Sequence, residues 1–227
     1  MRGPEIPGWD GYCERWSTAH GGYDPRTAPW LVRGWLRLGH ALGSTLLRAG
    51  VSSPNAVTTL GLLLSAGVPV AAATLPAGAF WAAVLVLCSA FADTIDGVLA
   101  VLADRASRLG QVYDSAADRL SEAAWLLAFA LTGAPVGLTV AAGGVMWLHE
   151  YVRARASVAG MTDIGTVTIA ERPTRVLLTI FGLLATLLDA RAALVAIAAA
   201  LVVAVVGFAQ LLRAVHRALR EADAGGR

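Results

Sequence analysis

The sequence predicts an all-α, multi-pass membrane protein in which six transmembrane helices follow an amphipathic helix at the membrane surface. First, 56% of the 227 residues are hydrophobic and only 15% are charged, with a mean hydropathy of +0.62. About a quarter of the residues in a soluble domain are charged, so a water-soluble globule is close to excluded. Second, apolar segments long enough to cross a bilayer follow one another with short breaks. Third, all 18 basic residues are Arg, and they gather in alternate breaks.

Residues 1–29 form a polar N-terminal preface. They contain several prolines and lack the apolar stretch of a cleavable signal peptide. The two cysteines, Cys13 and Cys88, match no metal-ligand spacing or disulfide framework. A net charge of +2 does not indicate a nucleic-acid partner.

Residues 30–49 predict an amphipathic juxtamembrane helix. Arg33 and Arg37 lie on other faces than its apolar stripe, which suits a helix lying on membrane lipids. The alternative is a helix packed against the rest of its own chain. The stripe has three- and four-residue steps and consists of Leu31, Trp35, Leu38, Leu42 and Leu46.

Six apolar spans follow a helix start at Ser53-Pro54. Each has about the twenty residues that cross a ~30 Å hydrocarbon core. We therefore expect a six-helix domain over 50–213 and a cytoplasmic tail over 214–227. The expected spans are 56–75, 78–101, 112–132, 136–156, 171–188 and 192–212.

The breaks between these spans differ in charge from one side to the other. On one side, the breaks near 75–78 and 132–135 carry no charge, and the third has only Asp189 and Arg191. By the positive-inside rule the other side, with both termini, faces the cytoplasm, so we expect a multi-pass protein of the plasma membrane. That side holds Arg105, Arg108, Arg153, Arg155, Arg172, Arg175, Arg213, Arg217 and Arg220.

Four aspartates interrupt the apolar pattern at the cytoplasmic ends of the second and third spans. At about 100° per residue, Asp93 and Asp96 fall within one arc of their helix, together with Gly97 and Ala100. On the next helix, Gly110, Asp114 and Asp118 form a stripe with four-residue steps. A short loop joins the two helices, so the two stripes can face each other.

Carboxylates are costly at membrane depth, so these four predict positive charge among them. Oxygen ligands with no Cys or His nearby suit a hard cation such as Mg²⁺ or Mn²⁺, and two such ions would balance four negative charges. The alternative is that the acids pair with Arg105, Arg108 and Arg119 or line a solvated loop.

The two stripes together resemble the signature of the CDP-alcohol phosphotransferase (CDP-alcohol phosphatidyltransferase) family. That signature is Asp-x-x-Asp-Gly-x-x-Ala-Arg, then eight residues, then Gly-x-x-x-Asp-x-x-x-Asp. The match runs from Asp93 to Asp118 with the family's spacing and departs from it at one fixed position. The resemblance extends from about Gly50 to Leu212, because segments 51–58 and 151–156 are also similar to actinobacterial members.

The resemblance implies six transmembrane helices, a homodimer and displacement of CMP from a CDP-linked donor by an alcohol. Carried over by position, it implies that Asp93, Asp96, Asp114 and Asp118 hold two divalent ions and that Asp118 is also the general base. The residues implied to contact the CDP part of the donor are Asn55, Ala56, Val57, Thr58, Gly97, Ala100, Ser107 and Gly110.

Val101 is the one departure, because the family has Arg at this position. The family Arg helps to hold the donor, so its replacement puts donor affinity or activity in question. Arg105 or Arg108 could supply the missing charge.

Several arginines near the fourth and fifth spans suit an acceptor that carries a phosphate. Arg153, Arg172 and Arg175 lie on the predicted cytoplasmic side, and the guanidinium group matches phosphate well. Their segments resemble most those of relatives that make phosphatidylinositol phosphate, and also those of relatives that use glycerol phosphate. Alternatively, they are ordinary positive-inside residues or bind anionic lipid headgroups.

The leading hypothesis is a phosphatidyltransferase of phospholipid biosynthesis, with its active site facing the cytoplasm. It would move a phosphatidyl group from CDP-diacylglycerol to inositol phosphate or glycerol phosphate and release CMP, using two Mg²⁺ or Mn²⁺ ions. One alternative is a divalent-cation transporter. Another is a catalytically weak relative that binds CDP-lipid, suggested by Val101.

Overall fold

The secondary structure of the described residues consists of helices joined by turns and loops. The computed structural model describes residues 6–19, 22–161, 168–189 and 191–225, and these contain no β-strand. The chain divides into two compact units, which we treat separately. Unit 1 takes the chain up to Leu64 together with Cys88–Leu120, and unit 2 takes Ser65–Leu87 together with the chain from Ser121.

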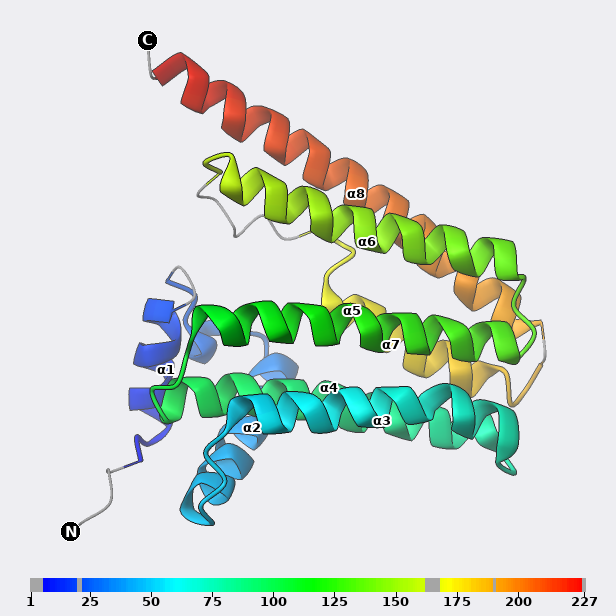
Figure 1. Cartoon of the computed structure of the whole chain (residues 1–227), viewed down its shortest axis with the longest axis horizontal. Coiled ribbons are helices and arrows are strands. Elements are labelled where there is room, and N and C mark those ends of the chain that lie inside the picture. The colour runs from blue at the N-terminus through cyan, green and yellow to red at the C-terminus, as the bar shows by residue number, and fades with distance from the viewer. Residues whose placement is uncertain (1–5, 20–21, 162–167, 190, 226–227) are drawn as a thin grey trace. The chain divides into compact units, whose positions relative to one another are not determined.

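Unit 1 contains the N-terminal helices and parts of three long helices (Figure 1). These are α1 (Trp9–Ala19), the short 3₁₀ helix η1 (Pro25–Thr27), α2 (Trp30–Arg48), and parts of α3 (Pro54–Thr74), α4 (Gly78–Leu102) and α5 (Arg108–Leu131). Small residues bring α3 close to α4, because a Cβ on Gly61 would lie 3.3 Å from the Cβ of Ala92.

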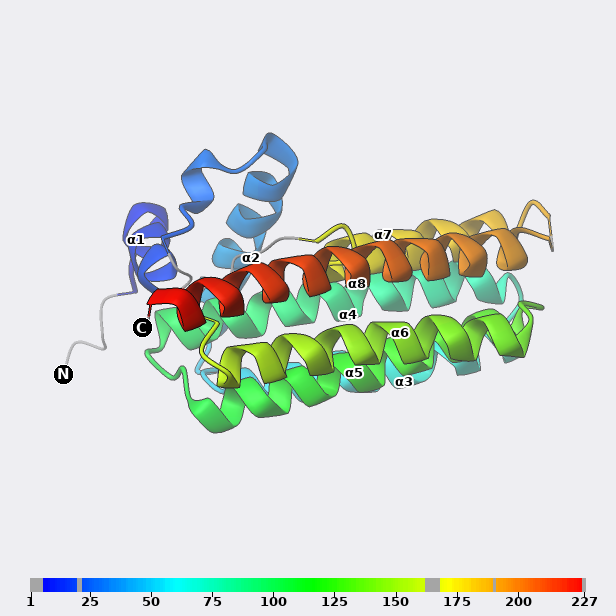
Figure 2. The same ribbon diagram turned by 90° about the horizontal axis from the view of Figure 1, so that it is seen from above.

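Unit 2 contains the remaining parts of α3, α4 and α5 and the three helices that follow. These are α6 (Val136–Val158), α7 (Arg172–Ala185) and α8 (Ala192–Gly225). α6 runs beside α8 (Figures 1 and 2), where Ala156, Met161 and Ala214 form a buried cluster. α7 also packs on α8, at Gly182, where a Cβ would lie only 2.7 Å from that of Ala196.

Three of the described helices are long and apolar enough to cross a membrane, namely α3, α4 and α8. The other predicted spans also coincide with helices, but α5 and α6 carry charged side chains and α7 has only 14 residues. At 1.5 Å per residue, a helix of that length reaches about 21 Å, short of a ~30 Å core. The structure therefore supports a membrane protein, and the count of six spans stays a prediction.

The N-terminal preface contains a helix that the sequence analysis did not predict. In α1, the side chains of Tyr12 and Cys13 are fully buried against Val98 and Leu102 of α4. Trp9 also packs on this cluster. The preface is polar on average, but α1 has an apolar face that docks on the C-terminal end of α4.

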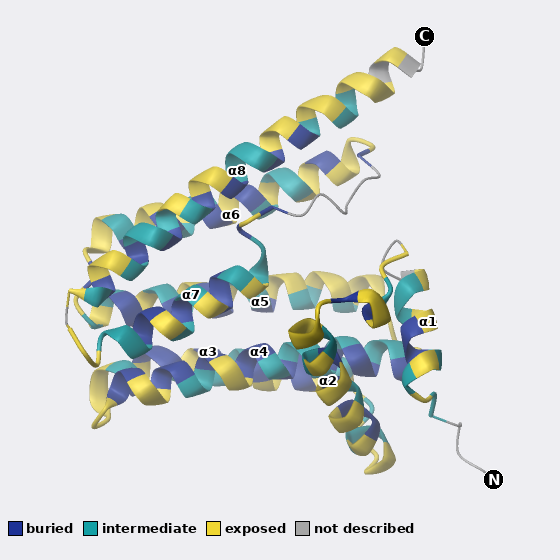
Figure 3. Ribbon diagram, turned by 180° about the vertical axis from the view of Figure 1, so that it is seen from behind, coloured by how far each residue is buried: buried dark blue, intermediate teal, exposed yellow. Residues whose placement is uncertain are grey.

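The predicted juxtamembrane helix α2 uses two faces. Its buried face packs on α4: the Trp35 indole N–H donates to Thr94 Oγ1 at 2.7 Å, and a Cβ on Gly43 would lie 2.6 Å from Val98 Cγ1. Its other face, largely exposed in Figure 3, carries Leu31 and Leu38. The packing alternative therefore holds for one face of this helix, and the membrane interpretation of its exposed face stays a prediction.

The α4–α5 turn sets where the two aspartate-bearing helices meet. Asp104 has a left-handed backbone (φ 52°), and the Arg105 N–H donates to the Ala100 carbonyl at 3.0 Å. This is the Schellman pattern, which ends a helix and reverses the chain. At the end of α2, Gly50 takes the same role with φ 87°.

Candidate active site

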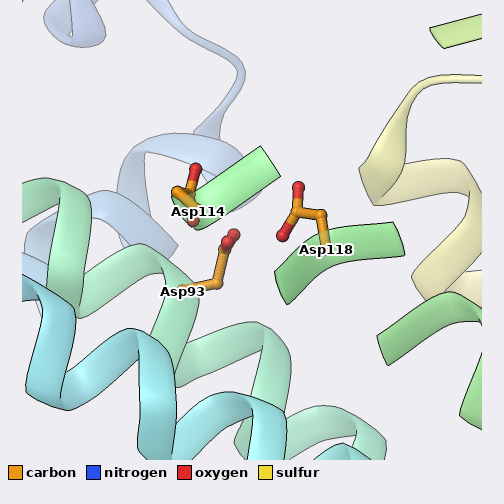
Figure 4. A group of neighbouring side chains, drawn as sticks. All are labelled: Asp93, Asp114 and Asp118. Carbon is orange, nitrogen blue, oxygen red and sulfur yellow. The ribbon is translucent and has the colours of Figure 1, made fainter. Parts of the chain in front are cut away.

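Three of the four predicted aspartates gather in unit 1. Asp93 comes from α4, and Asp114 and Asp118 lie one turn apart on α5. Their side chains point toward one another (Figure 4), and one carboxylate oxygen from each lies within 4.8 Å of the others. All three are partly buried. The two stripes predicted from the sequence do face each other.

Asp96 lies outside this group, although it belongs to the same predicted stripe. Its side chain is buried, and Thr58 of α3 donates a hydrogen bond to its Oδ2 at 2.6 Å. Thr58 thereby holds a fourth carboxylate near the three that cluster.

A pocket of about 220 Å³ lies beside these acids. It is lined from the start of α3, the end of α4, the following turn and the start of α5. Its lining residues are Pro54, Asn55, Thr58, Asp96, Gly97, Ala100, Val101, Arg105, Ala106, Ser107, Gly110, Gln111 and Asp114.

The N-termini of two helices converge on this pocket. Ser107 caps α5 by accepting the Gly110 N–H at 3.0 Å, and Ser53 accepts the Ala56 N–H of α3 at 3.4 Å. The two ends are close, because a Cβ on Gly110 would lie 3.5 Å from Asn55 Oδ1. Helix N-termini attract anions through their amide N–H groups and dipoles. The pocket therefore combines acids that suit a cation with helix ends that suit a phosphate.

Most of the residues expected to contact the donor line this pocket, with two exceptions. Val57 is buried in a hydrophobic cluster with Ala92 and Leu99, and Ala56 is exposed outside the lining. Arg105, one of the two candidates for the charge missing at position 101, does line the pocket.

Gln111 is a lining residue that the sequence analysis missed. It lies four residues after Ser107 and three before Asp114, so helical periodicity alone could have placed it on this face.

The arginines predicted to bind an acceptor phosphate lie in unit 2, where two of them pair with glutamates. Arg175 is only 5% exposed, and its guanidinium lies 3.2 Å from Glu122 and 2.9 Å from Glu150. Arg153 donates to Glu171 at 2.6 Å. These contacts link α5, α6 and α7 through alternating charges.

Arg172 has a different environment from its two neighbours. Its guanidinium carbon lies 5.9 Å from the centre of the Trp125 ring, within the range of a cation–π contact.

The donor set of the aspartate group fits a divalent metal ion. Carboxylate oxygens are the ligands that Mg²⁺ and Mn²⁺ prefer, and three groups on two helices can converge on one ion. The pairing alternative has partial support, because Arg119 lies 3.8 Å from Asp118. The three carboxylates nevertheless lie within 4.8 Å of one another.

Comparison with known proteins agrees with this geometry. The family model described as CDP-alcohol phosphatidyltransferase matches residues 51–208. The chain belongs to this family. The match covers the three clustered aspartates, Asp96 and the whole pocket lining, so the chain is a CDP-alcohol phosphatidyltransferase by family.

Its relatives include enzymes that make inositol phospholipids. The chain is 32% identical to phosphatidylinositol phosphate synthase of Mycolicibacterium smegmatis over 157 residues, which are 65% of this chain and 68% of that protein. It is also 32% identical to archaetidylinositol phosphate synthase of Pyrococcus horikoshii over 146 residues, 60% of this chain and 71% of that protein.

Two solved structures of Mycobacterium tuberculosis phosphatidylinositol phosphate synthase share the fold. The complex with manganese and citrate superposes with a TM-score of 0.65 at 25% identity, covering 78% of this chain and 88% of that one. The complex with CDP-DAG has a TM-score of 0.62 at 24% identity, covering 79% and 92%. Membership of this family favours an enzyme over a cation transporter.

Proposed function

We propose that this phosphatidyltransferase transfers a phosphatidyl group from CDP-diacylglycerol to a phosphorylated polyol and releases CMP. The observation that carries the proposal is the group formed by Asp93, Asp114 and Asp118 beside a pocket onto which two helix N-termini converge. A diphosphate needs a cation for its charge and N–H donors for its oxygens, and this pocket offers places for both.

Asp93, Asp96, Asp114 and Asp118 would hold two divalent ions, Mg²⁺ or Mn²⁺. When bound, the ions would neutralise the diphosphate and the departing CMP. The hydrogen bond from Thr58 would keep the Asp96 carboxylate in position to bind an ion. A related solved structure contains manganese, which supports a metal site in this part of the family.

Asp118 is proposed as the general base. The acceptor hydroxyl gives its proton to the Asp118 carboxylate as its oxygen bonds to the phosphorus that carries the diacylglycerol. The bond from that phosphorus to the bridging oxygen breaks, and CMP leaves with the electron pair. Such proton transfer contributes roughly 10²- to 10⁴-fold in rate.

The acceptor is proposed to be inositol phosphate or glycerol phosphate. The relatives are inositol phosphate-type synthases by name, and arginines gather near the fourth and fifth predicted spans; both support a phosphate-bearing acceptor. We assign its phosphate to Arg153 and Arg172. Arg175 is buried between two glutamates, so its proposed part is to position them.

We propose a multi-pass arrangement in the cell membrane with the site on the cytoplasmic side. The Arg-rich breaks between apolar segments support this orientation. The exposed leucines of α2, such as Leu31 and Leu38, would lie in the interface of the same leaflet. A homodimer is proposed from the family resemblance.

The direct test is to incubate the purified protein with CDP-diacylglycerol, Mg²⁺ or Mn²⁺ and a panel of alcohols. We expect CMP release that depends on metal and acceptor, with a phospholipid phosphate identified by mass spectrometry. No CMP release with any acceptor would contradict the proposal. If CMP appeared only in a Val101→Arg variant, the alternative of a catalytically weak relative would be correct.

A further inference from the structure

Helix α1 lies outside the segment that matches the family and yet borders the candidate donor pocket. The family match begins at residue 51, whereas α1 covers Trp9–Ala19. Its aromatic and apolar residues at positions 9, 12, 13 and 16 have the spacing of one helix face. That face packs on the end of α4, the helix that carries Asp93 and Asp96.

Val101 connects α1 to the pocket. Its side chain packs against the buried cluster of Tyr12, Cys13, Val98 and Leu102, and Val101 also lines the pocket. A guanidinium at this position would have to leave an apolar cluster. With α1 docked, Val suits position 101 better than the family's Arg, because its side chain packs against the apolar residues of α1.

Trp16 reaches Gly97, one of the residues that line the pocket. Two carbons on the outer edge of its indole, Cζ3 and Cη2, lie 3.9 and 4.0 Å from where a Cβ of Gly97 would stand. Gly97 lines the pocket, whereas Trp16 is not among the lining residues, so the indole ring lies directly next to a residue of the lining. Trp16 is held there partly by a ring contact with Tyr12, whose centre lies 5.7 Å away.

The position of this ring along α4 suits the nucleoside of a nucleotide. Gly97 follows Asp93 by four residues, which is about 6 Å along one face of a helix. A diphosphate held at the aspartates would place its nucleoside about one turn further on. Aromatic side chains bind bases through their π faces, and they do so without regard to sequence.

We propose that α1 forms an apolar wall of the donor pocket and that the Trp16 indole contacts the nucleoside of the CDP-linked donor over Gly97. This rests on the proposed function of the same pocket. In this arrangement an aromatic wall takes over donor binding from the charge that the family places at position 101.

The test compares two tryptophans of the same helix. Trp16→Ala should raise the KM for CDP-diacylglycerol and the inhibition constant of CMP about tenfold, within the range for base–aromatic stacking, and leave kcat within about twofold. Trp16→Phe should recover part of the affinity. The control is Trp9→Ala, because Trp9 packs on the same cluster but contacts Arg37 and His40 of α2.

Cys13 reports whether α1 stays docked. It is fully buried, and burial raises the pKa of its thiol, so it should resist maleimide in a Cys88→Ala background. Trp16→Phe should leave this protection intact while lowering donor affinity. Val101→Arg should abolish the protection and weaken donor binding.

Three outcomes would overturn the inference. In the first, Trp16→Ala keeps the wild-type KM and CMP inhibition. In the second, Trp9→Ala and Trp16→Ala weaken donor binding equally. In the third, Val101→Arg binds the donor more tightly while Cys13 remains protected. A wild-type protein that neither releases CMP nor binds CDP-diacylglycerol would instead refute the proposed function, and the role of α1 with it.

Discussion

Acids occur in two arrangements in this molecule, one in each unit. In unit 2, Glu122, Glu150 and Glu171 alternate with Arg153 and Arg175 at 2.6 to 3.9 Å. In unit 1, three aspartates face one another within 4.8 Å. The first set balances its charge with its own arginines and is suited to holding helices together. The second brings three carboxylates close together, where they repel one another, and a bound cation would offset that repulsion, as is typical of a functional site.

The largest expected effect is on catalysis in unit 1. Asp118→Asn should lower the rate of CMP release by about 10²- to 10⁴-fold, because it removes the proposed base and also a carboxylate ligand. Rates would be measured at saturating metal and donor. The matched control is Glu122→Gln, four residues later on α5, whose loss should appear mainly in stability. Near wild-type turnover by Asp118→Asn would show that the aspartate group is not the reaction centre.

In unit 2 we expect substitutions to change mainly the stability of the protein, and in unit 1 mainly its catalysis. Arg175→Met leaves two buried or half-buried glutamates without this partner, and breaking such a pair costs about 3–5 kcal/mol. We expect a large fall in the denaturation temperature in detergent. Asp114→Asn in the metal-free protein should leave that temperature unchanged or raise it, because it reduces repulsion among the aspartates. If both variants lost the same stability, the contrast between the units would be wrong.

A smaller effect is expected at the contact that holds Asp96. Thr58→Val keeps the shape of the side chain but removes the hydrogen bond to Asp96 Oδ2. Loss of a hydrogen bond to a buried carboxylate costs about 1–3 kcal/mol. We therefore expect the metal affinity to fall by about tenfold. Thr59→Val is the control, because Thr59 bonds Tyr113 rather than an aspartate. Equal metal affinity in Thr58→Val and wild type would remove Asp96 from the metal site.

The smallest effect is expected in the turn between the aspartate-bearing helices. Asp104 adopts a left-handed backbone, where Gly is relaxed, so Asp104→Gly should stabilise the protein by up to about 1 kcal/mol and leave activity unchanged. Gly160 has the corresponding conformation at the end of α6, with φ 101°. Gly160→Ala should destabilise by a similar amount. Thermal denaturation of both variants checks the pair, and a less stable Asp104→Gly would contradict the expectation.

The sequence predicted the parts that depend on local periodicity. Four-residue steps placed Asp114 and Asp118 on one face of a helix, and the apolar segments located the helices from α3 to α7 within a few residues. The start of α8 was also predicted, but this helix runs to Gly225, through most of the segment that was expected to be a tail. Most of the residues that the family resemblance implied to contact the donor line the pocket, whereas Ala56 and Val57 do not. These features follow from 3.6 residues per turn and from the hydropathy of each segment.

The features that were missed depend on contacts between distant segments. Nothing in the composition of the preface showed that Tyr12 and Cys13 would dock on α4, because the polar residues of α1 hide its short apolar face. Two ion-pair partners were also missed. Glu122 lies far from Arg175 in the sequence, and Glu171 is separated from Arg153 by a loop. Pairing between helices is decided by tertiary packing, which periodicity alone does not specify.

The measurement that tests the central claim most directly is Mn²⁺ binding to the purified protein, followed by electron paramagnetic resonance. The account predicts saturable binding that is tightened by CDP and lost in Asp114→Asn, whereas Arg175→Met retains it if folded. Wild-type protein that leaves Mn²⁺ free in solution, or an Asp114→Asn variant that binds it as tightly, would contradict the account.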